Sequence, residues 1–149
     1  MHALRRTVLI GAMLAATVGV VVATALPAAA ADGKVYAYQY RYWQGFYCGW
    51  VGSDTDWSTC YDNAGHLHNM LNQASSLWNN GYAGGYDKVN FYWGKSYYGA
   101  WACLGVGDYW ADLPLGREHF TWGAGKRGYG QVVNDNVASH KWVTRCGNP

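Results

Sequence analysis

Charged side chains are scarce in this sequence, and no part of it is strongly basic or acidic. Lys, Arg, Asp and Glu make up 13% of the residues, and the formal net charge is +2. Arg5 and Arg6 supply this excess, because the rest of the chain has nine basic and nine acidic side chains. A near-neutral surface without a basic stripe attracts phosphate weakly. We therefore expect no nucleic-acid partner.

The sequence motifs of common catalytic and zinc sites are also absent. The chain has no H-E-x-x-H, no G-x-S-x-G and no C-x-x-C. His66 and His68 alternate as two zinc ligands on a strand would, but on a helix their side chains would diverge. We expect ordinary surface histidines here, a protein that is not an enzyme, and no required cofactor.

Long apolar runs are lacking except at the N-terminus. One run extends from Val8 to Leu26, after Arg5 and Arg6, and the small residues Ala28 to Ala31 follow it. This layout is typical of a cleaved signal peptide, which we predict at residues 1–31. A retained membrane anchor is the alternative, because the run nearly reaches the length of a bilayer span. We expect a secreted, extracellular protein whose single domain, residues 32–149, has no membrane contact after cleavage.

Only four cysteines are present, Cys48, Cys60, Cys103 and Cys146, and all lie beyond the leader. An even number in an exported domain predicts two disulfides, for which three pairings are open. Turn-forming residues lie between Cys48 and Cys60, which suits a disulfide across a hairpin. We favour this pair, which leaves Cys103 for Cys146.

The pattern of the remaining residues is typical of an all-β fold. Glycine is abundant, with 20 residues, and runs of alternating aromatic and small residues lie at 35–43, 89–93 and 100–104. The stretch from Ala64 to Leu77 differs. Its apolar residues Leu67, Met70, Leu71 and Ala74 lie three and four positions apart, which predicts a short helix or helical turn.

An internal repeat indicates two related β units. Residues 71–78 (LNQASSLW) return 64 positions later as residues 135–142 (DNVASHKW). Each copy follows a strand, a glycine-containing turn and a second strand, so we predict one unit at about 34–80 and another at about 87–143. Two such units bury their apolar faces by packing into one sandwich.

The second unit resembles the βγ-crystallin-like peptidase inhibitors, a secreted bacterial family that includes metalloproteinase inhibitors. The likeness rests on an aromatic corner, a glycine turn, an Ala-Asp-Leu stretch and the closing repeat: Tyr92, Tyr97 and Gly99; Leu104, Gly105 and Gly107; Ala111, Asp112 and Leu113; and 135–142. In the first unit Trp50 stands for the corner aromatic, but Asp56 and Trp57 occupy the expected glycine region. The resemblance implies a double Greek-key sandwich, monomeric and non-enzymatic, that inhibits an extracellular peptidase of the metallopeptidase class.

The resemblance also implies a folded hairpin at the aromatic corner. Gly99 would take positive φ there, Tyr92 or Tyr97 would cover the fold, and Ser139 would hydrogen-bond to it.

An extra segment in the second unit, residues 114–131, is the first candidate for an inhibitory loop. It mixes aromatic and charged residues with glycine, a composition suited to protein binding: Arg117, Glu118, His119, Phe120, Trp122, Lys126 and Arg127. The alternative is an insertion that covers a sheet edge. The Cys48–Cys60 hairpin is the second place where we expect an inhibitory segment.

Calcium is the ligand that the fold implied by the resemblance often holds, through the pattern N/D-N/D-x-x-S/T-S. Its donors here would be Asn72, Ser75, Asp135, Asn136 and Ser139, although Leu71 and His140 replace one position in each copy. The alternative role of these side chains is hydrogen bonding within turns.

Tryptophan and tyrosine, with nine and 13 residues, exceed what a core of this size requires. Some rings should therefore reach the surface, where they would stack on the sugars of a wall polymer. Alternatively, Trp50, Trp78, Trp101 and Trp142 are core residues and the other rings are scattered. Two functions thus stand beside inhibition: a calcium- or carbohydrate-binding module, and a toxin-like antimicrobial protein of the same fold.

Overall fold

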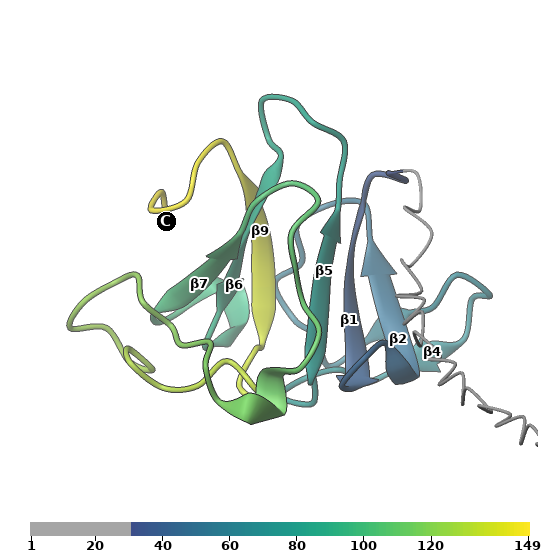
Figure 1. The fold of residues 1–149 in the computed structure, drawn as a ribbon, viewed down its shortest axis with the longest axis horizontal. Coiled ribbons are helices and arrows are strands. Elements are labelled where there is room, and N and C mark those ends of the chain that lie inside the picture. The colour runs from purple at the N-terminus through teal and green to yellow at the C-terminus, as the bar shows by residue number, and fades with distance from the viewer. Residues whose placement is uncertain (1–30) are drawn as a thin grey trace, which may run out of the picture.

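The computed structural model describes residues 31–149, so the predicted leader lies, apart from Ala31, outside the described residues. Short strands dominate this part (Figure 1). They are β1 (Lys34–Tyr40), β2 (Gln44–Trp50), β3 (Cys60–Tyr61), β4 (Leu67–His68), β5 (Ser76–Asn80), β6 (Lys88–Tyr92), β7 (Trp101–Leu104), β8 (Tyr109–Trp110) and β9 (Ser139–Val143). Two 3₁₀ turns, η1 (Lys95–Tyr97) and η2 (Leu113–Leu115), complete the set.

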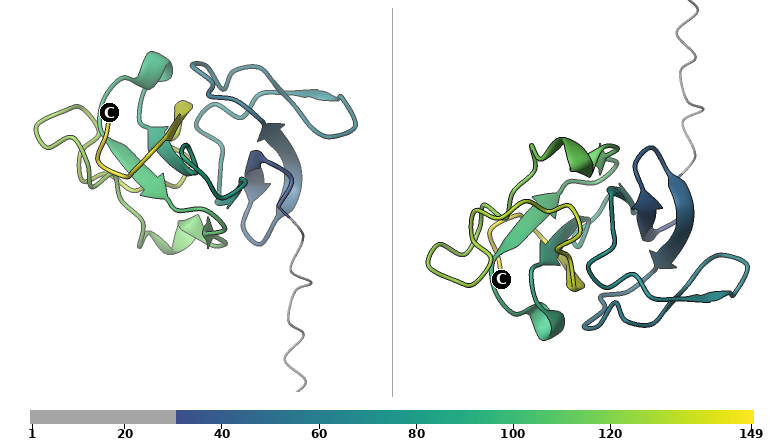
Figure 2. Two further views of the ribbon diagram at one scale, coloured as in Figure 1. Left: turned by 90° about the horizontal axis from the view of Figure 1, so that it is seen from above. Right: turned by 90° about the horizontal axis from the view of Figure 1, so that it is seen from below.

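The strands form two main sheets and one small hairpin. The first sheet has the order β2-β1-β5-β8, the second has the order β7-β6-β9, and β3 pairs with β4. Figure 2 shows the two sheets facing each other as the layers of a sandwich. The predicted all-β, double Greek-key architecture is therefore confirmed.

Each half of the chain contributes to the sheet of the other half. Strand β8 follows β7 in sequence but pairs with β5 of the first sheet. In the reverse direction, Asp54 forms an isolated bridge with His140 of β9. This exchange joins the halves through backbone hydrogen bonds as well as through their shared core.

Alternation along the strands places apolar residues between the sheets. Val35 and Ala37 of β1, Leu77 of β5, and Val89 and Phe91 of β6 are all fully buried. They pack in one continuous cluster with further buried residues from the loops. The runs of alternating residues in the sequence thus become strands with one face in the core.

Both halves contain a folded hairpin of the kind expected only for the second. In the second half Gly99 has a φ of 90°, and the Ser139 hydroxyl accepts a hydrogen bond from the Tyr97 amide (3.1 Å) and donates to the Gly94 carbonyl (2.6 Å). The ring of Tyr92 lies 5.4 Å from that of Tyr97. The predicted corner is confirmed.

The corresponding corner of the first half lies between β1 and β2. Gly45 has a φ of 78°, and the Ser76 hydroxyl accepts from the Trp43 amide (3.3 Å) and donates to the Tyr40 carbonyl (2.9 Å). Tyr38 and Trp43 are 5.5 Å apart, in the places of Tyr92 and Tyr97. The prediction that placed this corner near Trp50, Asp56 and Trp57 was wrong. The corner precedes β2, whereas Trp50 is the last residue of β2 and Asp56 and Trp57 follow it.

The structural repeat also differs by one position from the sequence repeat. Ser76 and Ser139 occupy equivalent places, so the closing segments of the two halves align with an offset of 63 and not 64. Backbone bonds agree, because Asn72 donates to Val137 and Asp135 donates to Ala74. A slip of one residue reverses the face of every strand residue. Trp78 and Trp142 match in the sequence repeat, but Trp142 packs against the core and Trp78 lies on the outer face of its sheet.

The helix predicted for Ala64–Leu77 is not formed. This stretch contains β4, a turn and the beginning of β5. Gly65 and Asn72 both have positive φ, at 85° and 54°, which a right-handed helix does not allow. The spacing of the apolar residues does not reflect one helical face. Met70 and Ala74 lie in a loop and are buried in the core, whereas Leu67 is 60% exposed.

Both favoured disulfides are present. Cys48 of β2 bonds Cys60 of β3, and Cys103 of β7 bonds Cys146 near the C-terminus. The first holds the β3–β4 hairpin against the first sheet, and the second attaches the C-terminal segment to the second sheet. No helix among residues 31–149 is long and apolar enough to cross a membrane.

Candidate functional site

The extra segment at residues 114–131 runs along the edge of the second sheet, beside β7 (Figure 1). Trp122 forms a bridge with Trp101 of β7, and the two residues exchange both backbone hydrogen bonds (3.1 and 3.0 Å). The Ala100 amide donates to the Arg127 carbonyl (2.8 Å). Phe120 is fully buried. Much of this segment therefore covers a sheet edge, which agrees with the structural alternative.

The cations of this segment lie over aromatic rings of the second sheet. The Lys126 ammonium lies 5.1 Å from the Trp101 ring, and the Arg127 guanidinium lies 5.4 Å from the Trp93 ring. The other candidates are less engaged: Arg117 and Trp122 are exposed, and Glu118 and His119 are half-buried. Lys126 and Arg127 are thus held against aromatic rings although both are exposed to solvent.

The β3–β4 hairpin, in contrast, extends outward from the sandwich (Figure 2). Tyr61 and Leu67 lie directly opposite each other in its register, and their exposed fractions are 59% and 60%. Opposed residues of an antiparallel pair share one face. The hairpin therefore presents two neighbouring apolar side chains that are not part of the core.

Asp62 organises the turn of this hairpin. Its carboxylate accepts hydrogen bonds from the amides of Ala64 (2.8 Å) and His66 (2.9 Å) and lies 2.8 Å from His66 Nδ1 and 3.3 Å from His68 Nε2. The backbone amide of His66, followed by the two imidazoles, lowers the pKa of Asp62 well below its usual value. The turn is thus held by its own side chain, as Asx turns are.

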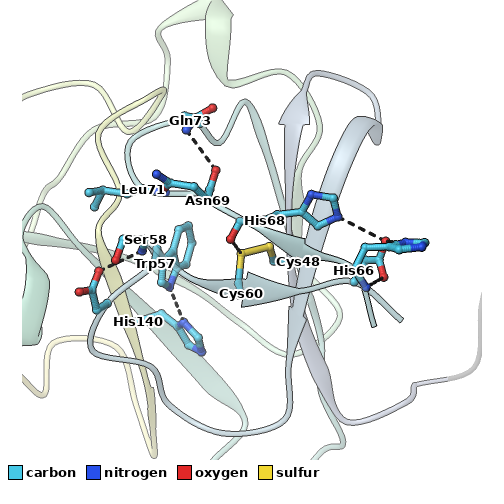
Figure 3. Close-up of a disulfide and its surroundings, with 12 residues drawn as sticks. Cys48, Trp57, Ser58, Cys60, His66, His68, Asn69, Leu71, Gln73 and His140 are labelled. Atoms are coloured by element: carbon cyan, nitrogen blue, oxygen red, sulfur yellow. Dashed lines mark hydrogen bonds and ion pairs between the residues drawn. A yellow bond between two sulfur atoms is a disulfide. The ribbon is translucent and has the colours of Figure 1, made fainter. Parts of the chain in front are cut away.

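The base of the hairpin is fixed as well. Cys60 and its partner Cys48 are buried (Figure 3). The His68 ring stacks on Phe46 of β2, with the ring centroids 4.8 Å apart. His66 and His68 do come together, but through direct hydrogen bonds to Asp62. No group of three or more His, Cys, Asp or Glu side chains in residues 31–149 has the arrangement of a metal site.

The residues considered for calcium take part in protein hydrogen bonds. Ser139 serves the folded corner, and the Asn136 amide donates to the carbonyls of Val132 (3.1 Å) and Asn134 (3.0 Å). Asp135 lies beside Ser75, whose hydroxyl bonds to it, and burial raises the pKa of the Asp135 carboxyl. Asn72 is exposed at a turn with positive φ. The structure therefore joins Ser75 and Asp135 across the two halves.

The tryptophans that could form the core are divided. Trp101 is buried, and Trp50 and Trp142 pack against the core cluster. Trp78 lies on the opposite face of the first sheet, where its ring stacks on Tyr36 at 5.8 Å. Sequence reasoning missed this face, although the alternation of Tyr36 and Tyr38 was its signal.

Neither a protein-family model nor a curated protein matches the sequence. Solved structures do. One, from work on the evolution of the eye-lens βγ-crystallin domain fold, has a TM-score of 0.50 at 18% identity and covers 77% of this chain and 89% of that chain. The chain has the βγ-crystallin fold.

Two other βγ-crystallins are similar at lower scores. One from an archaeon has a TM-score of 0.47 at 14% identity and covers 74% of this chain and 96% of its own. One from Ciona intestinalis has a TM-score of 0.47 at 14% identity and covers 74% and 99%. At such identities the likeness concerns the fold alone, so the function of this βγ-crystallin-like chain has to be argued from its own surfaces.

Proposed function

We propose that this protein is a secreted inhibitor of an extracellular metallopeptidase and that the β3–β4 hairpin is the segment that enters the peptidase cleft. The observation that carries the proposal is a projecting hairpin that is fixed at both ends. The Cys48–Cys60 disulfide fixes its base, and the Asp62 carboxylate fixes its turn. The resemblance of the second unit to secreted peptidase inhibitors supports the same function.

A segment fixed in this way suits inhibition for an entropic reason. Ordering a flexible loop on binding costs about 0.5–1.5 kcal/mol for each immobilised side chain, and a pre-organised loop avoids most of that cost. The hairpin also offers exposed apolar anchors in Tyr61 and Leu67. Residues 114–131 are less suited, because their backbone pairs with β7 and Phe120 is buried.

The test is inhibition of a panel of secreted metallo- and serine peptidases by the purified, oxidised protein without its leader. We expect stoichiometric inhibition of a metallopeptidase. We expect truncation of both apolar anchors together to reduce the binding free energy by about 2 kcal/mol. The double variant Tyr61→Ala/Leu67→Ala should therefore raise the inhibition constant about 30-fold.

The matched control is Leu115→Ala, which removes a side chain that is 54% exposed but lies far along the chain in η2. It should leave inhibition unchanged. Two results would contradict the proposal: no inhibition of any peptidase at 10 µM protein, or unaltered inhibition by the double variant while Arg117→Ala abolishes it. The second result would move the inhibitory segment to residues 114–131.

A further inference from the structure

The first sheet bears a continuous row of aromatic side chains on the face that points away from the core. We call it the aromatic face, and it consists of Tyr36, Tyr38, Trp43, Tyr47, Trp78 and Tyr109. The register places Tyr47 opposite Tyr38, Trp78 opposite Tyr36, and Tyr109 opposite Trp78. Opposed residues share a face, so these side chains lie together from β2 across β1 and β5 to β8.

The neighbours of these residues along each strand point the other way. Val35, Ala37, Cys48 and Leu77 are fully buried in the core. Because successive side chains alternate between faces, the aromatic residues must point outward. The pleat of the sheet therefore sets the row, except for Trp43, which lies in the turn between β1 and β2.

The rings contact one another across all four strands. Tyr47 lies 5.4 Å from Tyr38, Tyr36 lies 5.8 Å from Trp78, and Trp43 lies 5.5 Å from both Tyr38 and Tyr109. Strands are about 4.8 Å apart, so the row extends for roughly 14 Å. This is a platform several rings long and not a single exposed side chain.

The equivalent face of the second sheet is closed. Tyr92 and Trp101 occupy it, and their exposed fractions are 1% and 5%. The segment containing Trp122 and Lys126 lies against Trp101, and the C-terminal segment is attached by the Cys103–Cys146 disulfide. On the aromatic face, Tyr38, Trp43, Tyr47 and Trp78 stay half-exposed and Tyr109 is 56% exposed. The sandwich thus seals one outer face and leaves the other open.

The open face also carries polar groups that the described part of the chain leaves free. The indole N–H groups of Trp43 and Trp78 and the hydroxyls of Tyr38 and Tyr109 have no hydrogen-bond partner within residues 31–149. Each can therefore bond to a ligand that lies on the rings. A surface that combines flat apolar faces with such donors suits a ligand that is apolar on one side and polar at its edge.

Charge decides the nature of this ligand. None of the six residues of the aromatic face is charged, and the charged side chains at its ends have polar partners within residues 31–149. Asp32 accepts a hydrogen bond from the Tyr36 hydroxyl. Lys34 donates to Asn63 at one end (2.7 Å), and Arg41 lies 3.8 Å from Asp112 at the other. A neutral ligand therefore matches this surface, whereas nucleic-acid stacking sites combine aromatic rings with a cationic groove.

We propose that the aromatic face binds an uncharged polysaccharide chain. The C–H faces of successive sugar rings pack on the aromatic rings, and the sugar hydroxyls bond to the free indole and phenol groups. The site adjoins the β3–β4 hairpin, whose Asn63 donates hydrogen bonds to the hydroxyls of Tyr47 and Tyr36 (both 3.3 Å). It uses neither Tyr61 nor Leu67, so it would give the protein a glycan anchor in addition to its proposed inhibitory segment.

The test is depletion of the purified, oxidised protein from solution by insoluble cellulose and by chitin, together with gel retardation by soluble β-1,3-glucan. We expect binding to at least one of these polysaccharides, unchanged by 0.5 M NaCl because neither partner is charged. Tyr109→Ala and Trp78→Ala should each weaken binding at least tenfold. Trp122→Ala is the control, since Trp122 is 42% exposed but lies outside the aromatic face.

The variants must retain the wild-type near-ultraviolet circular dichroism and melting temperature for their binding to be compared. Tyr109→Ala satisfies this condition most readily, because its side chain is more than half exposed. The proposal is overturned if the protein binds none of the three polysaccharides, or if Trp122→Ala weakens binding as much as Tyr109→Ala. Binding of a proline-rich peptide with no binding of polysaccharide would also overturn it, because such peptides dock on aromatic surfaces too.

Discussion

His140 makes the stability of this protein depend on pH in a window that its sequence alone does not identify. The side chain is fully buried in β9. Its Nδ1 accepts a hydrogen bond from the Trp57 indole (2.9 Å; Figure 3). Its Nε2 lies 2.9 Å from the Gly52 carbonyl, to which it donates. The ring is therefore neutral, with its proton on Nε2, and both nitrogens are satisfied.

The magnitude follows from the pKa of this imidazole. Burial lowers the pKa of His140 from 6.5 to about 4. Between these values the unfolded chain binds a proton that the folded chain does not, so the free energy of unfolding falls as the pH falls. The full effect of this shift is about 3 kcal/mol, of which about 2 kcal/mol is lost by pH 5. This contribution is complete above pH 6.5, and acidification below pH 4 removes no more of it.

The assay is urea unfolding followed by tryptophan fluorescence at several pH values between 7.5 and 4. Asp56 does not interfere, since its pKa is lowered from 3.8 to about 2 and its contribution is lost only below this window. His140→Gln is the comparison, because glutamine keeps an acceptor and a donor but does not titrate in this range.

We expect the wild type to lose about 2 kcal/mol more than His140→Gln between pH 7 and pH 5. Equal losses in the two proteins would refute the reasoning, because they would place the pH dependence in other groups. A wild type whose unfolding free energy stays constant over this range would refute it as well.

Two further predictions concern the folded corner and the disulfides. Gly99→Ala should lower the free energy of unfolding by about 2–3 kcal/mol, since φ is 90° and the new Cβ would lie 2.7 Å from the backbone carbonyl oxygen of Arg127. Gly107 also has positive φ, but a new Cβ there would lie in open space. In the same urea assay, Gly107→Ala should therefore lower the free energy of unfolding by only about 1 kcal/mol. Replacing both cysteines of the Cys103–Cys146 disulfide by serine should cost about 4 kcal/mol, and replacing those of Cys48–Cys60 about 3 kcal/mol, because the first closes 43 residues and the second 12. The opposite order in urea unfolding would show that native-state effects outweigh the entropy of the unfolded chain.

The sequence predicted those features of the fold that depend on local pattern. Alternation and turn residues indicated an all-β chain, and the turn between Cys48 and Cys60 led to the correct pairing of all four cysteines. The corner at Tyr92, Tyr97 and Gly99 was recognised as well. The same spacing at Tyr38, Trp43 and Gly45 was available but was overlooked.

The alignment of the two repeats was wrong where identical residue types did not occupy equivalent positions in the structure. The repeat aligned tryptophans at an offset of 64, whereas hydrogen bonding by Ser76 and Ser139 sets the offset at 63. The tryptophans are the larger side chains, but the serine hydroxyls are the groups that hydrogen-bond to the backbone of the folded corners. Corner serines are therefore the better markers for aligning the two halves.

The helix predicted at 64–77 failed for a related reason. Apolar residues that lie three and four positions apart do not by themselves require a helix. A loop that packs against the core can have the same pattern. Gly65 and Asn72 at positive φ were the contrary signals, because glycine and asparagine adopt that conformation most readily. Loop placement itself depends on contacts distant in sequence, so the outward extension of the β3–β4 hairpin could not be predicted locally.

The unequal burial of the two outer faces supports our proposal that the aromatic face has a role beyond stability. Burying an aromatic ring stabilises a fold by about 1.5–3 kcal/mol, and the second sheet obtains this from Tyr92 and Trp101 by covering them. The first sheet buries Tyr36 to 4% exposure but leaves the rings around it partly open. Since smaller polar residues would suffice on a surface that only meets water, the large rings at Trp78 and Tyr109 are better explained by a ligand that they contact. In this proposal the buried Tyr36 ring packs against Trp78, and the more exposed rings around it contact the ligand.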